Sequence, residues 1–303
     1  MFRRKVKIEP SGFQLDHSSK MITIGSCFSD TIGEKLNETR FDIMLNPFGT
    51  IFHPIALANS IERFSPHQIL ERDNYFFHWQ TGGKHHSTTE SELKEQMLTL
   101  RDSFEERLKE VDVIMVTFGT AWGYEMKSSG EIVANCHKMP QDLFEKKLYS
   151  SSDILSAWKP LVEAYPQIRW VFTVSPVRHW KDGVRENNLS KGILHQVIHE
   201  LLVLENASYF PAYEIMLDEL RDYRFYAKDY LHPSDEAVDY IWGRFKETYF
   251  NERTANLVTK IEGVNNSRAH KLMYPNSEEA LNFKRALDRQ EEEIQKALNE
   301  FRA

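Results

Sequence analysis

The chain has 303 residues, of which 41% are hydrophobic and 27% charged, and its formal net charge is −7. This length allows one large α/β domain, or one domain with a helical appendage. The negative charge argues against a nucleic-acid-binding protein, which needs clustered positive charge.

Targeting signals and cysteine use point to the cytoplasm. No apolar run approaches 18 residues, so we expect no membrane span, and the basic N-terminus lacks the apolar core of a secretory signal. The two cysteines, Cys27 and Cys136, do not make a disulfide framework and fit a reducing compartment. We therefore expect a cytoplasmic protein.

Four short apolar segments predict buried strands, at residues 21–24, 111–118, 168–174 and 207–210. The run 113–118 does not alternate with polar residues, as expected for a parallel strand covered on both faces. Helical patterns occupy residues 31–36, 90–109, 152–165 and 188–206. Strands that alternate with helices in this way indicate βαβ units and a mostly parallel sheet.

Two segments do not follow this alternation. Residues 37–83 are rich in Pro, His and aromatic residues, and we interpret them as a long excursion from the sheet that shapes a substrate cleft. Residues 251–303 are charge-rich and helical, with Ser277 as the predicted N-cap of the last helix. We therefore divide the chain into a domain over 1–250 and a helical C-terminal extension over 251–303. We expect the apolar stripe of the last helix to be exposed, which would permit a homodimer: Leu281, Leu287, Ile294 and Leu298.

Gly25, Ser26 and Cys27 follow the first predicted strand and precede a helix. Parallel strands bring their last residues to the edge of the sheet where open α/β folds place their sites. The free N–H groups of a helix N-terminus can lower a thiol pKa and hold an oxyanion. From this fragment alone, Cys27 is equally well interpreted as a small structural residue buried at a turn.

Asp229 precedes His232 by three residues, just ahead of another predicted helix. This spacing lets the carboxylate orient the imidazole as a general base. The alternative is that Asp229 and Ser234 cap the helix and His232 is a surface residue. A nucleophile at a strand-to-helix turn together with a distant Asp/His pair predicts covalent acyl transfer.

These motifs, in this order, resemble the GDSL/SGNH hydrolase superfamily, and residues 25–29 resemble the namesake motif of the GSCFA family, with Ser29 where that motif has Ala. Residues 46–50, 117–122 and 133–138 are also similar to that family. The resemblance covers about residues 20–250. It implies a flavodoxin-like three-layer α/β/α sandwich, an SGNH-hydrolase-like fold with a mostly parallel sheet and a helical C-terminal extension.

The resemblance also implies roles for individual residues. Cys27 falls where SGNH enzymes have their Ser nucleophile, with Ser26 as the alternative if the turn shifts by one residue. Asp229 and His232 match the late Asp-x-x-His motif. Gly49 corresponds to the isolated Gly whose N–H would join that of Cys27 in an oxyanion hole.

Ala121 departs from the pattern, because SGNH enzymes have Asn at this position. Losing one oxyanion donor typically costs about 10²–10³ in rate. Either another group replaces it, with Asn135, Asn46 and Thr120 as candidates, or the site no longer hydrolyses efficiently. Further residues are candidates for contacting the substrate: Asn46, Thr120, Trp122, His137 and Arg178, with His179 beside Arg178.

We expect no metal and no cofactor. His78, His85 and His86 are clustered, but they lack the spacing at which ligands converge on a metal ion. The sequence therefore predicts an acyl-ester hydrolase or acyltransferase that acts on a small-molecule or glycan ester, a cell-wall component being one by analogy with the superfamily. The alternative is a non-catalytic module that binds a glycan or peptide on the same fold.

Overall fold

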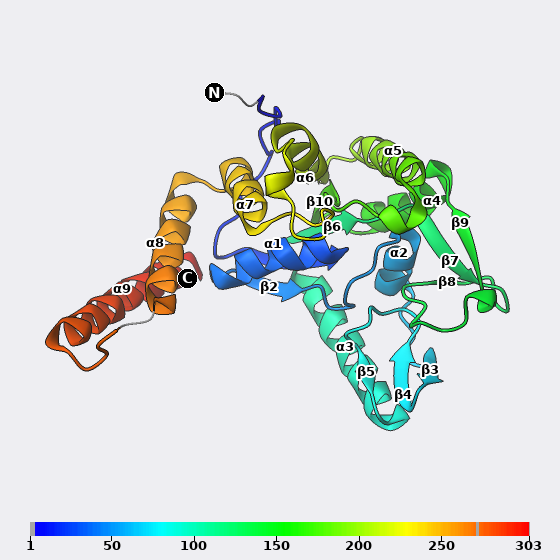
Figure 1. Cartoon of the computed structure of the whole chain (residues 1–303), viewed down its shortest axis with the longest axis horizontal. Helices are drawn as coiled ribbons and strands as arrows, with labels where there is room; N and C mark the ends of the chain where they lie inside the picture. The colour runs from blue at the N-terminus through cyan, green and yellow to red at the C-terminus, as the bar shows by residue number, and fades with distance from the viewer. Residues whose placement is uncertain (1–3, 271–272, 303) are drawn as a thin grey trace.

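A five-stranded parallel sheet forms the centre of the computed structural model, which describes residues 4–270 and 273–302 (Figure 1). The bounds of its strands are Lys20–Gly25 for β1, Asp42–Leu45 for β2, Val113–Phe118 for β6, Arg169–Val174 for β10 and Ala207–Tyr209 for β11. The four strands predicted from the sequence are confirmed, whereas β2 was missed because its four half-buried residues carry no clear period.

The strands lie in the order β11-β10-β6-β1-β2. Numbered along the chain, this is the order 2-1-3-4-5 of flavodoxin-like folds, which confirms the predicted fold class. The strand order reverses between β1 and β6. Open parallel sheets leave a crevice at the carboxyl ends of such a pair of strands, and ligands bind there.

Helices cover both faces of the sheet because alternate strand residues point to opposite sides. Ile22 and Ile24 belong to one buried apolar cluster, and Met21 belongs to another. The first face packs against α2 (Pro54–Glu62), α3 (Glu90–Glu110), α4 (Ser151–Ala164) and α5 (Val184–Leu201). The second face packs against α1 (Cys27–Glu38), α6 (Ala212–Glu214) and α7 (Asp235–Tyr249). The result is three layers, helix, sheet and helix.

The excursion over residues 37–83 is more regular than expected. It contains β2, α2, β3 (Ile69–Arg72) and β4 (Tyr75–His78), and the last two form a small antiparallel sheet with β5 (His86–Ser87), which follows the segment. A second small sheet follows β6 and consists of β7 (Trp122–Met126), β8 (Ile132–Val133) and β9 (Phe144–Leu148). These strands are too short to show a period in the sequence.

Two C-terminal helices, α8 (Glu252–Ala269) and α9 (Glu278–Arg302), pack against each other beside α7 (Figure 1). Ser277 caps α9, since its Oγ accepts a hydrogen bond from the Ala280 N–H at 3.2 Å, as predicted. No helix in the described part of the chain is long and apolar enough to cross a membrane.

The apolar stripe of α9 was predicted to be exposed, and for three of its four residues this is wrong. Leu287, Ile294 and Leu298 are buried, and the last two pack against α8, whereas Leu281 is exposed. An amphipathic helix buries its apolar face wherever a partner is nearby, and here the neighbouring helix of the same chain supplies it. The homodimer stays a prediction, but three of the four apolar residues on which it was based are buried within the chain.

Candidate active site

The chain makes a tight turn between β1 and α1, and glycine is required there. Gly25 has a φ of 127°, and a Cβ on it would lie 2.2 Å from the carbonyl oxygen of Thr117 on β6. The next residue, Ser26, donates its backbone N–H to the same oxygen at 3.1 Å. Cys27 is then the first residue of α1, at the carboxyl edge of the sheet where the strand order reverses.

The two candidate nucleophiles differ in accessibility. The Ser26 side chain is fully buried, and its Oγ has no hydrogen-bond partner among the described residues, whereas Cys27 is only partly buried. Burial, and secondarily the charge of Asp30, raise the pKa of the Cys27 thiol, while Lys191 and the N–H groups of Phe28 and Cys27 oppose the shift. The thiol is therefore protonated near neutral pH and needs a base to become a nucleophile.

Asp229 and His232 form a hydrogen-bonded pair on the loop before α7. One carboxylate oxygen accepts the backbone N–H groups of Leu231 and His232 at 2.9 and 3.0 Å, and the other lies 2.6 Å from His232 Nδ1. These backbone hydrogen bonds and the imidazole lower the pKa of Asp229 to about 2. Ser234, not Asp229, caps α7. The geometry leaves His232 Nε2 as the ring nitrogen that faces away from the carboxylate.

Lys191 on α5 is a site residue that the sequence analysis missed. Its side chain is 2% exposed, and Nζ donates to the carbonyl oxygens of Gly119 and Ser175, at 2.8 Å each. These carbonyls follow β6 and β10, so the ammonium group lies at the same sheet edge as Cys27 and interacts with its charge. Burial lowers the pKa of Lys191 to about 7.

A signal for Lys191 was present in the sequence. Leu194 and Ile198 follow it by three and seven residues, which places the lysine on the buried face of the predicted helix. A lysine on an apolar stripe needs polar partners, and a sheet edge with free carbonyl groups provides them.

His179 interacts electrostatically with both Lys191 and His232. Burial, and secondarily the charge of Lys191, lower the pKa of His179 to about 4, and the charge of His232 acts in the same direction. Its ring packs edge-to-face against Phe52 at 5.2 Å, and its Nε2 is buried without a partner in the described chain. Cys27, Lys191, His179 and His232 thus form a series of electrostatic neighbours at one edge of the sheet.

The expected oxyanion donors are engaged elsewhere. The Gly49 N–H donates to the Asn46 carbonyl at 2.8 Å, so it is not free to bind an oxyanion in this conformation. Ala121, at which the resemblance implied an Asn, is fully buried, and its N–H donates to Ser190 Oγ at 2.7 Å. Asn135 Oδ1 accepts the His137 N–H at 2.7 Å, which stabilises a local turn. The N–H groups of Cys27 and Phe28, which interact with the thiol, are the donors left at the site.

Asn46, a predicted substrate contact and oxyanion candidate, makes its hydrogen bonds within the protein. It is fully buried, its Oδ1 accepts the Gly25 N–H at 3.2 Å, and its Nδ2 donates to Asp30 at 3.0 Å. Thr50 also donates to Asp30, at 3.1 Å. The end of β2 therefore ties the glycine turn to the first turn of α1.

Two other predicted substrate contacts, Thr120 and His137, are also buried and hydrogen-bonded within the protein. Thr120 Oγ1 shares a hydrogen bond with Ser190 Oγ at 3.0 Å and accepts the Trp122 N–H at 3.1 Å. His137 Nε2 lies 2.9 Å from the His78 carbonyl oxygen. Trp122 is partly exposed on β7, with the Lys146 ammonium 4.9 Å from its ring centroid, so its predicted role stays untested.

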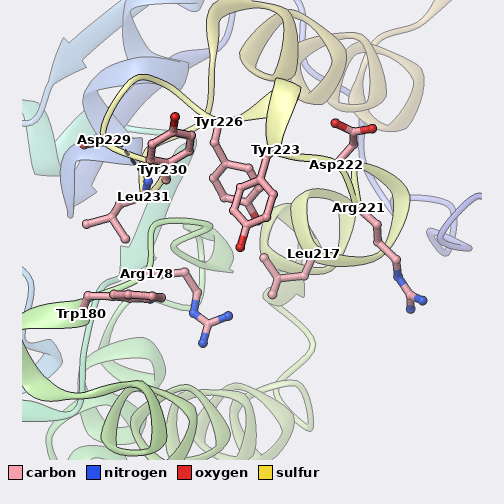
Figure 2. A pocket seen from close by; sticks show the side chains of 10 residues that line it. All are labelled: Arg178, Trp180, Leu217, Arg221, Asp222, Tyr223, Tyr226, Asp229, Tyr230 and Leu231. Carbon is pink, nitrogen blue, oxygen red and sulfur yellow. Dashed lines mark hydrogen bonds between the residues drawn. The ribbon is translucent and has the colours of Figure 1, made fainter.

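Arg178 lies in a pocket of about 660 Å³ that also includes Asp229 of the Asp229–His232 pair (Figure 2). Trp180, Tyr223 and Tyr226 supply aromatic walls. Figure 2 shows the Arg178 side chain between Trp180 and Leu217. The pocket is therefore an immediate neighbour of the candidate general base.

The clustered histidines have structural partners. His78 Nε2 lies 2.8 Å from the Ser65 carbonyl oxygen, and His85 Nε2 lies 2.7 Å from that of Pro47. Burial lowers the pKa of His78 to about 4. Within residues 4–270 and 273–302, no three His, Cys, Asp or Glu side chains are grouped so that they could hold a metal ion.

We expect Lys191→Met to slow alkylation of Cys27 by iodoacetamide. The lysine charge favours the thiolate, so its removal raises the thiol pKa further and lowers the reactive fraction. The slowing should be largest at about pH 6 and shrink above neutral pH, because the wild-type lysine itself loses its charge there. Both proteins would carry Cys136→Ser so that Cys27 is the thiol followed, and circular dichroism would check folding. Identical rate profiles would exclude this role for Lys191.

The solved structures that are similar to this chain include two proteins of low sequence identity. A proposed platelet activating factor from Streptococcus pneumonia is 12% identical, with a TM-score of 0.39, over 76% of this chain and 83% of that one. An acetyl xylan esterase from the rumen bacterium Butyrivibrio proteoclasticus is 10% identical, with a TM-score of 0.36, over 76% and 63%. None of the curated proteins matches the sequence significantly.

The family match is more extensive. The model of the GSCFA family matches residues 20–245, which include the glycine turn, Cys27, Lys191 and the Asp229–His232 loop. This range covers the whole central sheet and the helices from α1 to most of α7. The chain belongs to the GSCFA family.

Proposed function

We propose that this protein hydrolyses or transfers the acyl group of carboxylic esters, with Cys27 as nucleophile and His232 as general base. The observation that carries the proposal is the Asp229–His232 pair, whose carboxylate is held by two backbone N–H groups and lies 2.6 Å from Nδ1. A carboxylate that orients an imidazole is the support that an acid–base histidine needs. Cys27, at a helix N-terminus on the same sheet edge, is the nucleophile that this base would serve.

In the proposed reaction, His232 takes the thiol proton as the Cys27 sulfur forms a bond to the ester carbonyl carbon. The N–H groups of Cys27 and Phe28 bind the resulting oxyanion. Collapse of the intermediate breaks the C–O bond, and the leaving alkoxide takes the proton from the imidazolium. Water then attacks the thioester with His232 as base again, which releases the acid and the free thiol. An acceptor hydroxyl in place of water would make the protein an acyltransferase.

A binding module is the second candidate, and the engaged oxyanion donors favour it. The N–H groups of Gly49 and Ala121 both have intramolecular acceptors, and the pKa of Cys27 is raised. A fold that keeps the cleft but lacks these donors would bind a glycan or peptide without cleaving it. The two candidates differ in whether ester turnover occurs at all.

Turnover of p-nitrophenyl acetate separates the candidates. We expect steady release of p-nitrophenol beyond one equivalent per protein, because any accessible thiol can be acylated once but only a working site is regenerated. A single burst that stalls indicates a transferase that lacks its acceptor. If protein shown to be folded gave neither a burst nor turnover, the binding module would be the remaining candidate.

A further inference from the structure

We propose that the pocket beside Asp229 binds a ring that carries a carboxylate, and that Arg178 recognises the carboxylate. Binding of the ring does not depend on catalysis. The further inference that the ring is part of an ester substrate rests on the proposed function. The pocket volume of about 660 Å³ suits a small molecule of one or two rings.

Arg178 differs from the other charged residues of the pocket in having no ion-pair partner within residues 4–270 and 273–302. The others each contact an opposite charge or a histidine: Arg221 pairs with Asp218 at 2.6 Å, Asp222 with Arg224 at 3.2 Å, and Asp229 with His232 at 2.6 Å. The pocket therefore contains one positive charge that no carboxylate of the described residues pairs with.

The surroundings of Arg178 make this charge costly when nothing is bound. Its Nε is buried without a partner in the described structure, and its Nη2 donates to Asn188 at 3.1 Å. The nearby ammonium of Lys191 adds a second positive charge, and Arg178 in turn lowers the pKa of that lysine. A guanidinium group matches a carboxylate in geometry, so an anionic ligand would relieve this excess positive charge.

Aromatic side chains define the rest of the pocket. Trp180, Tyr223 and Tyr230 are largely exposed to solvent although they are large apolar groups. Their rings and that of Tyr226 line the same pocket as Arg178 (Figure 2). Such surfaces stack on flat ligands, either aromatic rings or the faces of sugars. The chemistry that fits both features is an aromatic acid or a uronic-acid sugar.

Equilibrium binding to the Cys27→Ala variant tests the proposal without any turnover. Isothermal titration calorimetry would compare 4-hydroxybenzoate with its methyl ester, and glucuronate with glucose. We expect at least one acid to bind about tenfold more tightly than its uncharged counterpart, and the acid that does so identifies the ring. Arg178→Gln should remove the preference, and Arg178→Lys should keep part of it.

Arg221→Gln is the matched control, since this arginine lines the same pocket but is paired with Asp218. It should retain the preference for the acid. Equal binding of acid and uncharged ligand would overturn the proposal, as would an equal loss of preference in the Arg178 and Arg221 variants. If the wild-type protein showed no ester turnover while the Cys27→Ala variant preferred the acid, the proposed function would be refuted and the proposed binding site would be supported.

Discussion

Cys27→Ala is expected to lower ester turnover by at least about 10³-fold, because the variant cannot form the thioester on which the proposed reaction depends. Cys27 is the first residue of α1, and it is the accessible member of the Ser26–Cys27 pair. Steady-state release of p-nitrophenol measures the loss. Mass spectrometry of the quenched wild-type protein should show an acyl group on Cys27.

Cys136→Ser is the matched control for this experiment. Cys136 is also partly buried, but burial raises the pKa of its thiol to about 11, and its charged neighbour is Lys181 instead of Lys191. Its replacement should leave turnover unchanged. If Cys27→Ala retained turnover, the nucleophile would have to be another residue, and the buried Ser26 would need a rearranged turn to serve.

His232→Ala is expected to lower turnover by about 10²–10⁴-fold, the usual contribution of a general base. Asp229→Asn should have a smaller effect in the same direction, because an amide cannot stabilise an imidazolium ion. The pKa of Asp229 is about 2, so its charge is constant from about pH 4 to pH 9. The Asn variant should therefore lose activity across this whole range, as a pH profile of kcat/KM would show.

Two other histidines provide controls. His199 is exposed on α5, and His199→Ala should have no effect. His179 is half-buried, and its pKa of about 4 keeps it uncharged near neutral pH. If His232→Ala kept the turnover of the wild-type protein and His179→Gln lost most of it, His179 would be the general base.

The order of secondary structure could be predicted because each buried parallel strand is a continuous apolar run. Residues 113–118 are buried on both faces and carry no period-two pattern, and this property distinguishes them in the sequence. The strand Asp42–Leu45 could not be predicted in the same way. It forms the edge of the sheet, its residues are half-buried, and its pairing with β1 depends on contacts distant in sequence.

Polar residues of the candidate site were harder to predict than the strands. Asn46, Thr120 and His137 follow or precede strands and looked suited to contact a substrate. In the structure each is buried and hydrogen-bonded within the protein. A sequence shows which donors and acceptors are present, but only the tertiary structure shows whether the backbone has already engaged them.

The sequence by itself determined the glycine turn before Cys27 and the Asp229–His232 pair. Both depend on interactions within a few residues: a φ of 127° that favours glycine, and a carboxylate that bonds N–H groups two and three residues further on. The environment of Cys27 was decided by the tertiary structure. Lys191 and His179 come from segments far along the chain, and only the packing of α5 against the ends of β6 and β10 brings the Lys191 ammonium group to this edge of the sheet, with His179 on the segment between β10 and α5.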